Sequence, residues 1–96
     1  MKDKNNNWEL LGWIKVSPIR KNILASLAMA PQLPSELAKQ YGVSFPVITK
    51  NLNLLVEKGI IICLSPNLKK GRIYALTEMG KKLLTLLIFS FKKNEI

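Results

Sequence analysis

A short corner between two helix-forming segments is the feature that most limits what this chain can fold into. Gly42 ends one segment of helical apolar spacing, and Val43 and Ser44 lead into the next, for which Ser44 is a natural N-cap. Because glycine adopts positive φ readily, the chain can turn sharply here, and the second helix must cross the first steeply. The sequence therefore predicts two helices joined by a tight turn, the second from about Ser44 to Lys58.

Apolar spacing gives these two helices an inner and an outer side. In the second helix, Ile48, Leu52 and Leu55 recur at helical spacing and are expected to face the core. Leu37 on the first helix, about Ser35 to Tyr41, is expected to pack against them. The positions left on the outer side of the second helix are Phe45, Pro46, Val47, Thr49, Lys50 and Asn53.

Two more helical segments are expected before this pair. Residues 2–7 are all charged or asparagine, so residues 1–7 are predicted to form a disordered tail, and Trp8 then opens a short segment of helical spacing. Ser17 followed by Pro18 is a helix start, because a capping hydroxyl precedes a proline in the first turn. That helix is expected to end before Pro31.

After the Ser44–Lys58 helix the apolar period changes to that of strands. Ile60–Leu64 and Arg72–Leu76 are short strand-like runs around a basic, turn-forming loop, so they predict a β-hairpin. Thr77 then caps a last helix that is expected to reach about Phe91. The predicted fold class is mainly α with a small β-hairpin (α+β): a three-helix core, a hairpin and a C-terminal helix.

This order of elements is that of a winged helix-turn-helix domain, in which the hairpin is the wing. We expect one domain over residues 8–82, because a chain of 96 residues with 48% apolar side chains suits a single packed core. Residues 83–96 are expected to form the end of the last helix, a dimerisation surface and a basic tail.

The net charge and the content of histidine and cysteine limit the partners and ligands that the chain can be expected to bind. A net charge of +9 favours a polyanion, either nucleic acid or an anionic lipid surface. The chain has no histidine, and its one cysteine, Cys63, is expected to be a small buried hydrophobe and not a redox sensor. We therefore expect no metal, cofactor or internal disulfide. The polar start and the absence of an apolar run of about 20 residues predict a cytoplasmic protein outside the membrane.

The outer side of the Ser44–Lys58 helix carries side chains that suit the major groove of DNA. Lys50 can reach guanine or a phosphate, and Asn53 can pair with adenine or bind the backbone. Thr49 suits a phosphate or a base edge, and Val47 can pack on a thymine methyl group. The alternative is that these are ordinary solvated helix residues.

The tip of the hairpin is a second candidate site. Lys69, Lys70 and Arg72 lie within four positions, so a flexible basic loop beside the Ser44–Lys58 helix could follow the phosphate backbone or probe the minor groove. A solvated turn that uses lysine for solubility is the alternative. Arg20 and Lys21 are further candidates for contact with the flanking backbone.

The last helix is apolar around more than one face. The surplus is expected to form an exposed patch, which a two-fold dimer would bury together with the segment around Trp8. An amphipathic anchor lying in a membrane surface is the competing interpretation. The predicted dimer residues are Trp8, Leu84, Leu87, Ile88 and Phe91.

Five strings carry a resemblance to a known family: Trp8–Gly12, Ser17–Arg20, Pro34–Ala38, Gly59–Ile61 and Gly71–Gly80. Together they resemble archaeal winged helix transcriptional regulators related to the ArsR and MarR groups. The resemblance spans about residues 8–84, and Gly71–Gly80 (GRIYALTEMG) is its most specific part. It implies a homodimeric transcription factor. By position it points to Ser44, Thr49, Lys50, Asn53, Lys69, Lys70 and Arg72 as DNA-binding residues. Phe45 and Pro46 depart from the pattern, because polar or basic residues often stand there, and the metal ligands of metal-sensing ArsR proteins are absent.

The predicted function is that of a transcriptional regulator that binds double-stranded DNA as a homodimer. Two alternatives stay open: a DNA-binding protein without sequence preference, chromatin-like or viral, and a winged helix used for protein contact. An enzyme is not expected, because the acidic residues are scattered and no nucleophile-and-base pair or phosphate-binding glycine loop is present.

Overall fold

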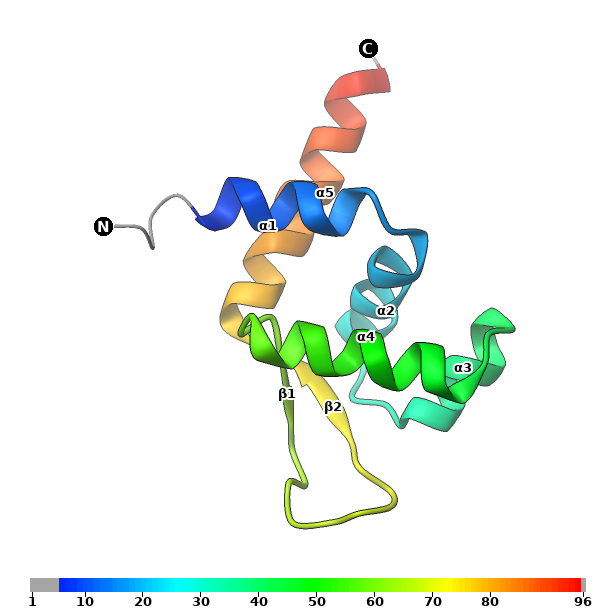
Figure 1. The fold of residues 1–96 in the computed structure, drawn as a ribbon. Helices are drawn as coiled ribbons and strands as arrows, with labels where there is room; N and C mark the ends of the chain where they lie inside the picture. Colours follow the sequence, from blue (N-terminus) through cyan, green and yellow to red (C-terminus); the bar gives the residue numbers. More distant parts are fainter. Residues whose placement is uncertain (1–5, 96) are drawn as a thin grey trace.

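The computed structural model describes residues 6–95, and the side chains of residues 7–89. Five helices and one antiparallel hairpin follow each other in the predicted order (Figure 1). They are α1 (Asn6–Lys15), α2 (Pro18–Met29), α3 (Pro34–Tyr41), α4 (Phe45–Glu57), β1 (Ile61–Cys63), β2 (Tyr74–Leu76) and α5 (Glu78–Glu95). The helix α1 starts inside the expected tail, whose residues 1–5 lie outside the described part, and α5 runs beyond the expected end.

The core is built from one side of every helix and from the start of the hairpin. The predicted inner positions of α3 and α4 are confirmed, because Leu37, Ile48, Leu52 and Leu55 have no exposed surface. Val43 in the corner packs against this core and is partly buried. Side chains from the other elements that are equally enclosed are Ile14, Ile23, Leu24, Ile60 and Leu83.

The corner between α3 and α4 has the predicted local geometry. Gly42 lies in the left-handed region with φ 65°, and the Val43 N–H donates to the Ala38 carbonyl oxygen at 3.1 Å. Ser44 is the N-cap of α4, since its Oγ accepts a hydrogen bond from the Val47 N–H at 3.4 Å. The corner therefore sets the direction of α4 through bonds within a few residues of sequence.

The loop between α2 and α3 adds a pairing to the hairpin that the sequence did not predict. Gln32 exchanges two backbone hydrogen bonds with Tyr74, at 3.0 and 2.9 Å, and so pairs with the free edge of β2. Pro31 and Pro34 have no N–H, which leaves Gln32 and Leu33 as the donors of this stretch. The Leu33 N–H bonds to the Glu36 carboxylate at 2.9 Å.

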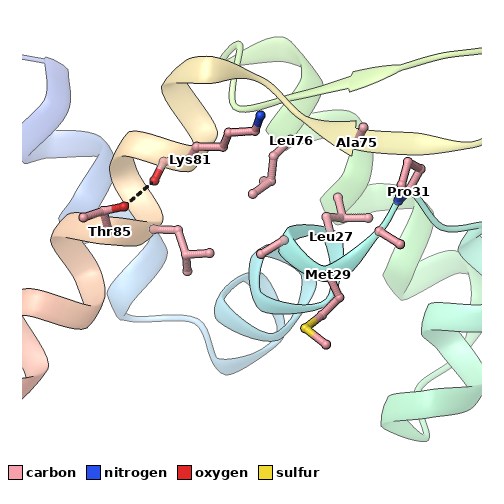
Figure 2. Close-up of a pocket in the computed structure, with 10 residues that line it drawn as sticks. Leu27, Met29, Pro31, Ala75, Leu76, Lys81 and Thr85 are labelled. Carbon is pink, nitrogen blue, oxygen red and sulfur yellow. Dashed lines mark hydrogen bonds between the residues drawn. The ribbon is translucent and has the colours of Figure 1, made fainter.

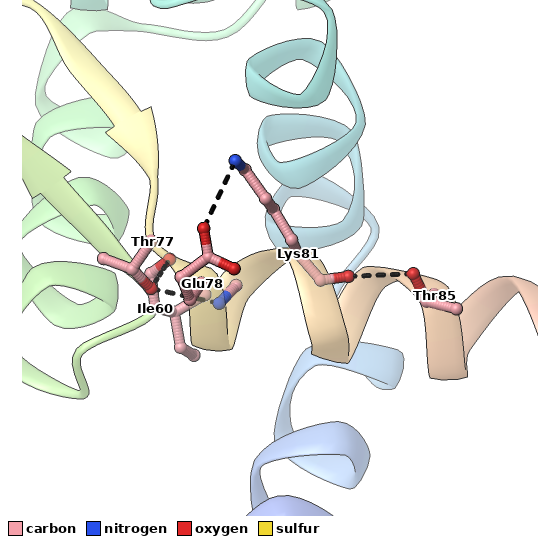
Figure 3. A network of polar contacts seen from close by, with 6 residues as sticks. Ile60, Thr77, Glu78, Lys81 and Thr85 are labelled. Carbon is pink, nitrogen blue, oxygen red and sulfur yellow. Dashed lines mark hydrogen bonds and ion pairs between the residues drawn. The ribbon is translucent and has the colours of Figure 1, made fainter.

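A polar junction fixes the start of α5 against the base of the hairpin (Figure 3). The Thr77 hydroxyl lies 2.7 Å from the Gly59 carbonyl oxygen and 2.9 Å from that of Ile60, and it accepts the Gly80 N–H at 3.0 Å. Gly80 is buried, and a Cβ added there would overlap the Ile60 carbonyl oxygen. Hydrogen bonds therefore explain the threonine of the Thr-Glu-Met-Gly string, and close packing explains its glycine.

Candidate nucleic-acid interface

The outer side of α4 is open to solvent, as expected. Lys50 and Asn53 are exposed, and Phe45 and Val47 keep 53% and 42% of their surface. Thr49 is half-buried, and its hydroxyl donates to the Pro46 carbonyl oxygen at 3.2 Å. No part of the described chain covers this side completely, so the helix presents polar and apolar side chains side by side.

A groove brings the two candidate sites together. Thr49 and Asn53 of α4 line it from one side, and Lys69, Lys70 and Arg72 from the wing line it from the other. Its volume is about 500 Å³. The sequence predicts that the basic loop lies beside this helix, and the fold confirms that the outer side of α4 and the wing share one surface. The remaining lining residues are Leu33, Pro34, Ser35, Phe45, Gly71 and Tyr74.

Arg72 sits deeper in this groove than the two lysines. Lys69 and Lys70 are exposed, whereas Arg72 is half-buried and its Nε has no hydrogen-bond partner among the described residues. Burial raises the pKa of the neighbouring Tyr74 hydroxyl, and the positive charge of Arg72 opposes part of that rise. The floor of the groove therefore holds a neutral phenol beside a cation.

Arg20, a candidate for contact with DNA, makes its contacts within the protein. Its Nη1 donates to the Trp13 carbonyl oxygen at 2.7 Å, and its guanidinium carbon lies 3.9 Å from the centre of the Trp13 ring. The Lys58 ammonium approaches the same ring at 5.0 Å, so Trp13 joins α1, α2 and the end of α4. These contacts place Arg20 at a structural junction, whereas Lys21 is exposed.

The fold exposes some of the predicted dimer residues and buries others. Trp8 and Ile88 are exposed, at 73% and 55%, and Leu84 is half-buried. The expectation of an exposed Leu87 is wrong, because this side chain is 8% exposed and belongs to the chain's own core. The Phe91 side chain lies outside the described residues. Phe89, which the sequence analysis did not select, is 68% exposed.

Three further expectations concern Cys63, metal binding and membrane spanning. Cys63 is half-buried and packs against the core. Within the described residues, no group of three histidine, cysteine or acidic side chains could hold a metal ion. Over the same residues, every helix is too short or too polar to cross a membrane.

A second surface pocket, of about 460 Å³, lies where the end of α2 meets β2 and α5 (Figure 2). Its lining is mainly apolar, with Leu27, Met29 and Leu76 around one charged side chain, that of Lys81. Neither the outer side of α4 nor the wing tip contributes to it. The pocket is therefore separate from the groove that joins α4 and the wing.

Solved structures with the same arrangement identify the fold. The repressor BigR from Xylella fastidiosa has 27% sequence identity and a TM-score of 0.73, and the match covers 100% of this chain and 94% of that protein. A point mutant of MepR from S. aureus has a TM-score of 0.75 at 20% identity, over 98% and 72% of the two chains. This chain has a winged helix-turn-helix fold.

A third structure has the same fold. The DNA-binding domain of Mb0332 from Mycobacterium bovis, a possible ArsR-family regulator described as homodimeric, matches with a TM-score of 0.68 at 17% identity. The match covers 94% of this chain and 80% of that domain. At 20% and 17% identity, the resemblances to MepR and Mb0332 establish the winged helix fold alone.

These matches concern transcriptional regulators, and the match to BigR supports a DNA-binding regulator. The three proteins come from bacteria, so the archaeal part of the sequence resemblance finds no support among them. No protein-family model matches the sequence, and no curated protein is similar to it.

Proposed function

We propose that this protein is a transcriptional regulator, not an enzyme, that binds double-stranded DNA as a homodimer. The observation that carries the proposal is the groove shared by α4 and the wing, since it aligns hydrogen-bonding side chains with cations on one surface. The match to the repressor BigR supports the same function. The net charge of +9 provides the long-range attraction to a polyanion.

The shape of the surface suits the two grooves of DNA. An exposed helix such as α4 fits the major groove, which is about 12 Å wide, and Lys50 and Asn53 are the side chains placed to contact base edges. Lys69 and Lys70 would then reach the backbone or the adjacent minor groove. Val47 would lie against a thymine methyl group, while Ser44 and Thr49 would bond to phosphates.

The dimer would form through α1 and α5. These helices pack against each other, and they carry Trp8, Ile88 and Phe89 as exposed apolar side chains. A two-fold axis through this surface would bury the apolar side chains of both copies. The homodimeric state of the Mb0332 domain supports this assembly. The two copies of α4 would then face successive major grooves, about 34 Å apart.

Selection of bound duplexes from a random pool tests the function. We expect a preferred site with two related halves, bound about 10³-fold or more tightly than random DNA at physiological salt. Lys50→Ala should change the selected bases at one position in each half-site, whereas Lys82→Ala, an equal loss of charge on α5, should leave the selected site unchanged. Binding without any preferred site would favour the general DNA-binding protein, and an absence of DNA binding would favour a winged helix used for protein contact.

Sedimentation velocity tests the dimer. Ile88→Glu places a charge in the proposed interface and should yield a folded monomer, because an unpaired charge is costly to bury. Met29→Glu is the control, since Met29 is 84% exposed at the end of α2 and is not among the proposed interface residues. A dimer that survives Ile88→Glu but dissociates with Met29→Glu would move the interface to the end of α2.

A further inference from the structure

The wing is a ribbon with two different faces. On one face Ile61 and Tyr74 are buried, at 2% and 5%, and pack against the domain. The pairing places Ile62 opposite Ala75, and the Leu64 N–H donates to the Ile73 carbonyl oxygen at 2.7 Å. Because side chains alternate along a strand, these residues belong to the other face. That face is therefore almost entirely aliphatic.

The aliphatic face is uncovered, and a further exposed aliphatic side chain lies at the tip of the wing. Ile62, Leu64 and Ile73 are 49%, 55% and 37% exposed, and Leu68 at the tip is 50% exposed. Single exposed aliphatic side chains are ordinary, but four along one short hairpin are not. The cations Lys69, Lys70 and Arg72 instead line the groove toward α4. Contact with DNA through the cations alone would leave the aliphatic face in water.

The tip holds Leu68 in a defined turn. Its N–H donates to the Ser65 carbonyl oxygen at 3.1 Å, and the Ser65 Oγ accepts the Ile73 N–H at 3.0 Å, which ties the two ends of the loop together. The stretch from Leu64 to Ile73 contains no acidic residue, so nothing in it repels a phosphate. Leu68 directly precedes Lys69 and Lys70 in this loop.

We propose that Leu68 enters the minor groove as an apolar wedge that opens a base step and bends the duplex. This inference rests on the proposed function, which brings the wing to the DNA. The lysines would hold the phosphates on the rims of the minor groove, and Leu68 would pack between them against deoxyriboses and base edges. Leucine is among the side chains that proteins insert between base steps, and such insertion unstacks the step and kinks the DNA by 20–90°.

The wedge also gives the protein a source of sequence preference that needs no hydrogen bond. Flexible pyrimidine–purine steps unstack at a lower cost than stiff ones, so a wedge favours sites that carry such a step at the right place. Phe45 and Pro46 occupy the start of α4, where polar side chains would otherwise contact bases. A contribution from the wing tip would therefore supplement base contacts by α4.

The experiment measures bending and unstacking in the full-length protein on its selected duplex. Energy transfer between dyes at the two ends reports the bend, and 2-aminopurine placed along the site reports the unstacked step. Leu68→Ala should abolish both signals and weaken binding about tenfold, as expected for loss of a buried leucine. The salt dependence of binding should stay unchanged, because both lysines remain. Leu68→Met should keep the bend.

Ile62→Ala is the matched control, since Ile62 is exposed to the same extent but lies at the base of the wing. We expect it to bend DNA like the unaltered protein. A bend that Leu68→Ala leaves intact, or DNA bound straight by the unaltered protein, would overturn the wedge while the proposed function stands. A protein that binds no duplex even at low salt would overturn both. Equal losses from Ile62→Ala and Leu68→Ala would assign the whole aliphatic face to a different contact and reject the wedge.

Discussion

The base and the tip of the wing differ in what holds their side chains. At the base, Ile61 and Tyr74 are buried, Thr77 bonds to the backbone before β1, and Gly80 lies against the Ile60 carbonyl group. At the tip, Lys69 and Lys70 are exposed, and no ion pair involving either is present among the described residues.

Within this one hairpin, we therefore expect the base to contribute to folding and the tip to contribute to DNA binding. Side chains at the base make contacts only in the folded chain, so their replacement should change the free energy of unfolding. Lys69 and Lys70 at the tip make few contacts within the protein, so their replacement should change affinity for DNA alone.

The largest effect is expected at Gly80. Gly80→Ala places a Cβ against the Ile60 carbonyl oxygen, an obstacle that belongs to the backbone and cannot rotate away. We expect a loss of about 3 kcal/mol of unfolding free energy, measured by urea denaturation. Gly12→Ala is the control, because nothing lies within 4 Å of an added Cβ there, and it should stabilise α1 by about 0.5–1 kcal/mol. Equal stability of the two variants would contradict the packing described for the junction in Figure 3.

A smaller loss is expected at Thr77. Thr77→Val keeps the shape of the side chain but removes the hydroxyl that caps α5 and bonds to the Gly59 and Ile60 carbonyl groups. We expect a loss of about 1–2 kcal/mol, measured by the same denaturation, with unchanged DNA affinity of the folded protein. Thr77→Ser keeps the hydroxyl and should recover most of this loss. If serine is no better than valine, the hydroxyl is not what stabilises the start of α5.

The smallest effect on stability is expected at the tip. Lys69→Ala combined with Lys70→Ala should change the unfolding free energy by less than about 0.5 kcal/mol. The same change should weaken binding to every duplex and reduce the slope of log affinity against log salt by about 3.6 for the dimer, because each copy loses two phosphate contacts. Fluorescence anisotropy at several salt concentrations measures both quantities.

The matched control removes two charges elsewhere. Lys81 and Lys82 lie on α5, away from the groove, and their replacement by alanine should leave the salt slope nearly unchanged. Equal slopes for the two double variants would mean that total charge, and not the position of the wing lysines, controls binding.

Local signals allowed most of the fold to be predicted. Ser17 and Ser44 cap α2 and α4 as expected, and Gly42 adopts positive φ at the corner. Each of these features depends on residues a few positions apart, so the local sequence is sufficient to predict it. The position of the wing beside α4 was also predicted, from the order of the elements. The shape of the groove between them was not, because Asn53 and Lys69 are distant in sequence and meet only through packing of the core.

The error at Leu87 and the omission of Phe89 have one physical cause. A helix that is apolar on several sides has no single face marked for the core, so spacing alone could not tell which leucines α1 and α2 would cover. The pairing of Gln32 with Tyr74 was missed for a related reason, since the two residues between Pro31 and Pro34 are too few to carry a strand pattern.

The sequence by itself determined the helices, their caps, the sharp corner and the cationic, aliphatic hairpin, because each is set by the conformational preferences of neighbouring residues. Only the tertiary structure decided that Leu87 is enclosed, that Arg20 rests on Trp13, and that Tyr74 lines the groove with Arg72. Those outcomes depend on which surfaces exclude water together, and that choice belongs to the packed chain as a whole.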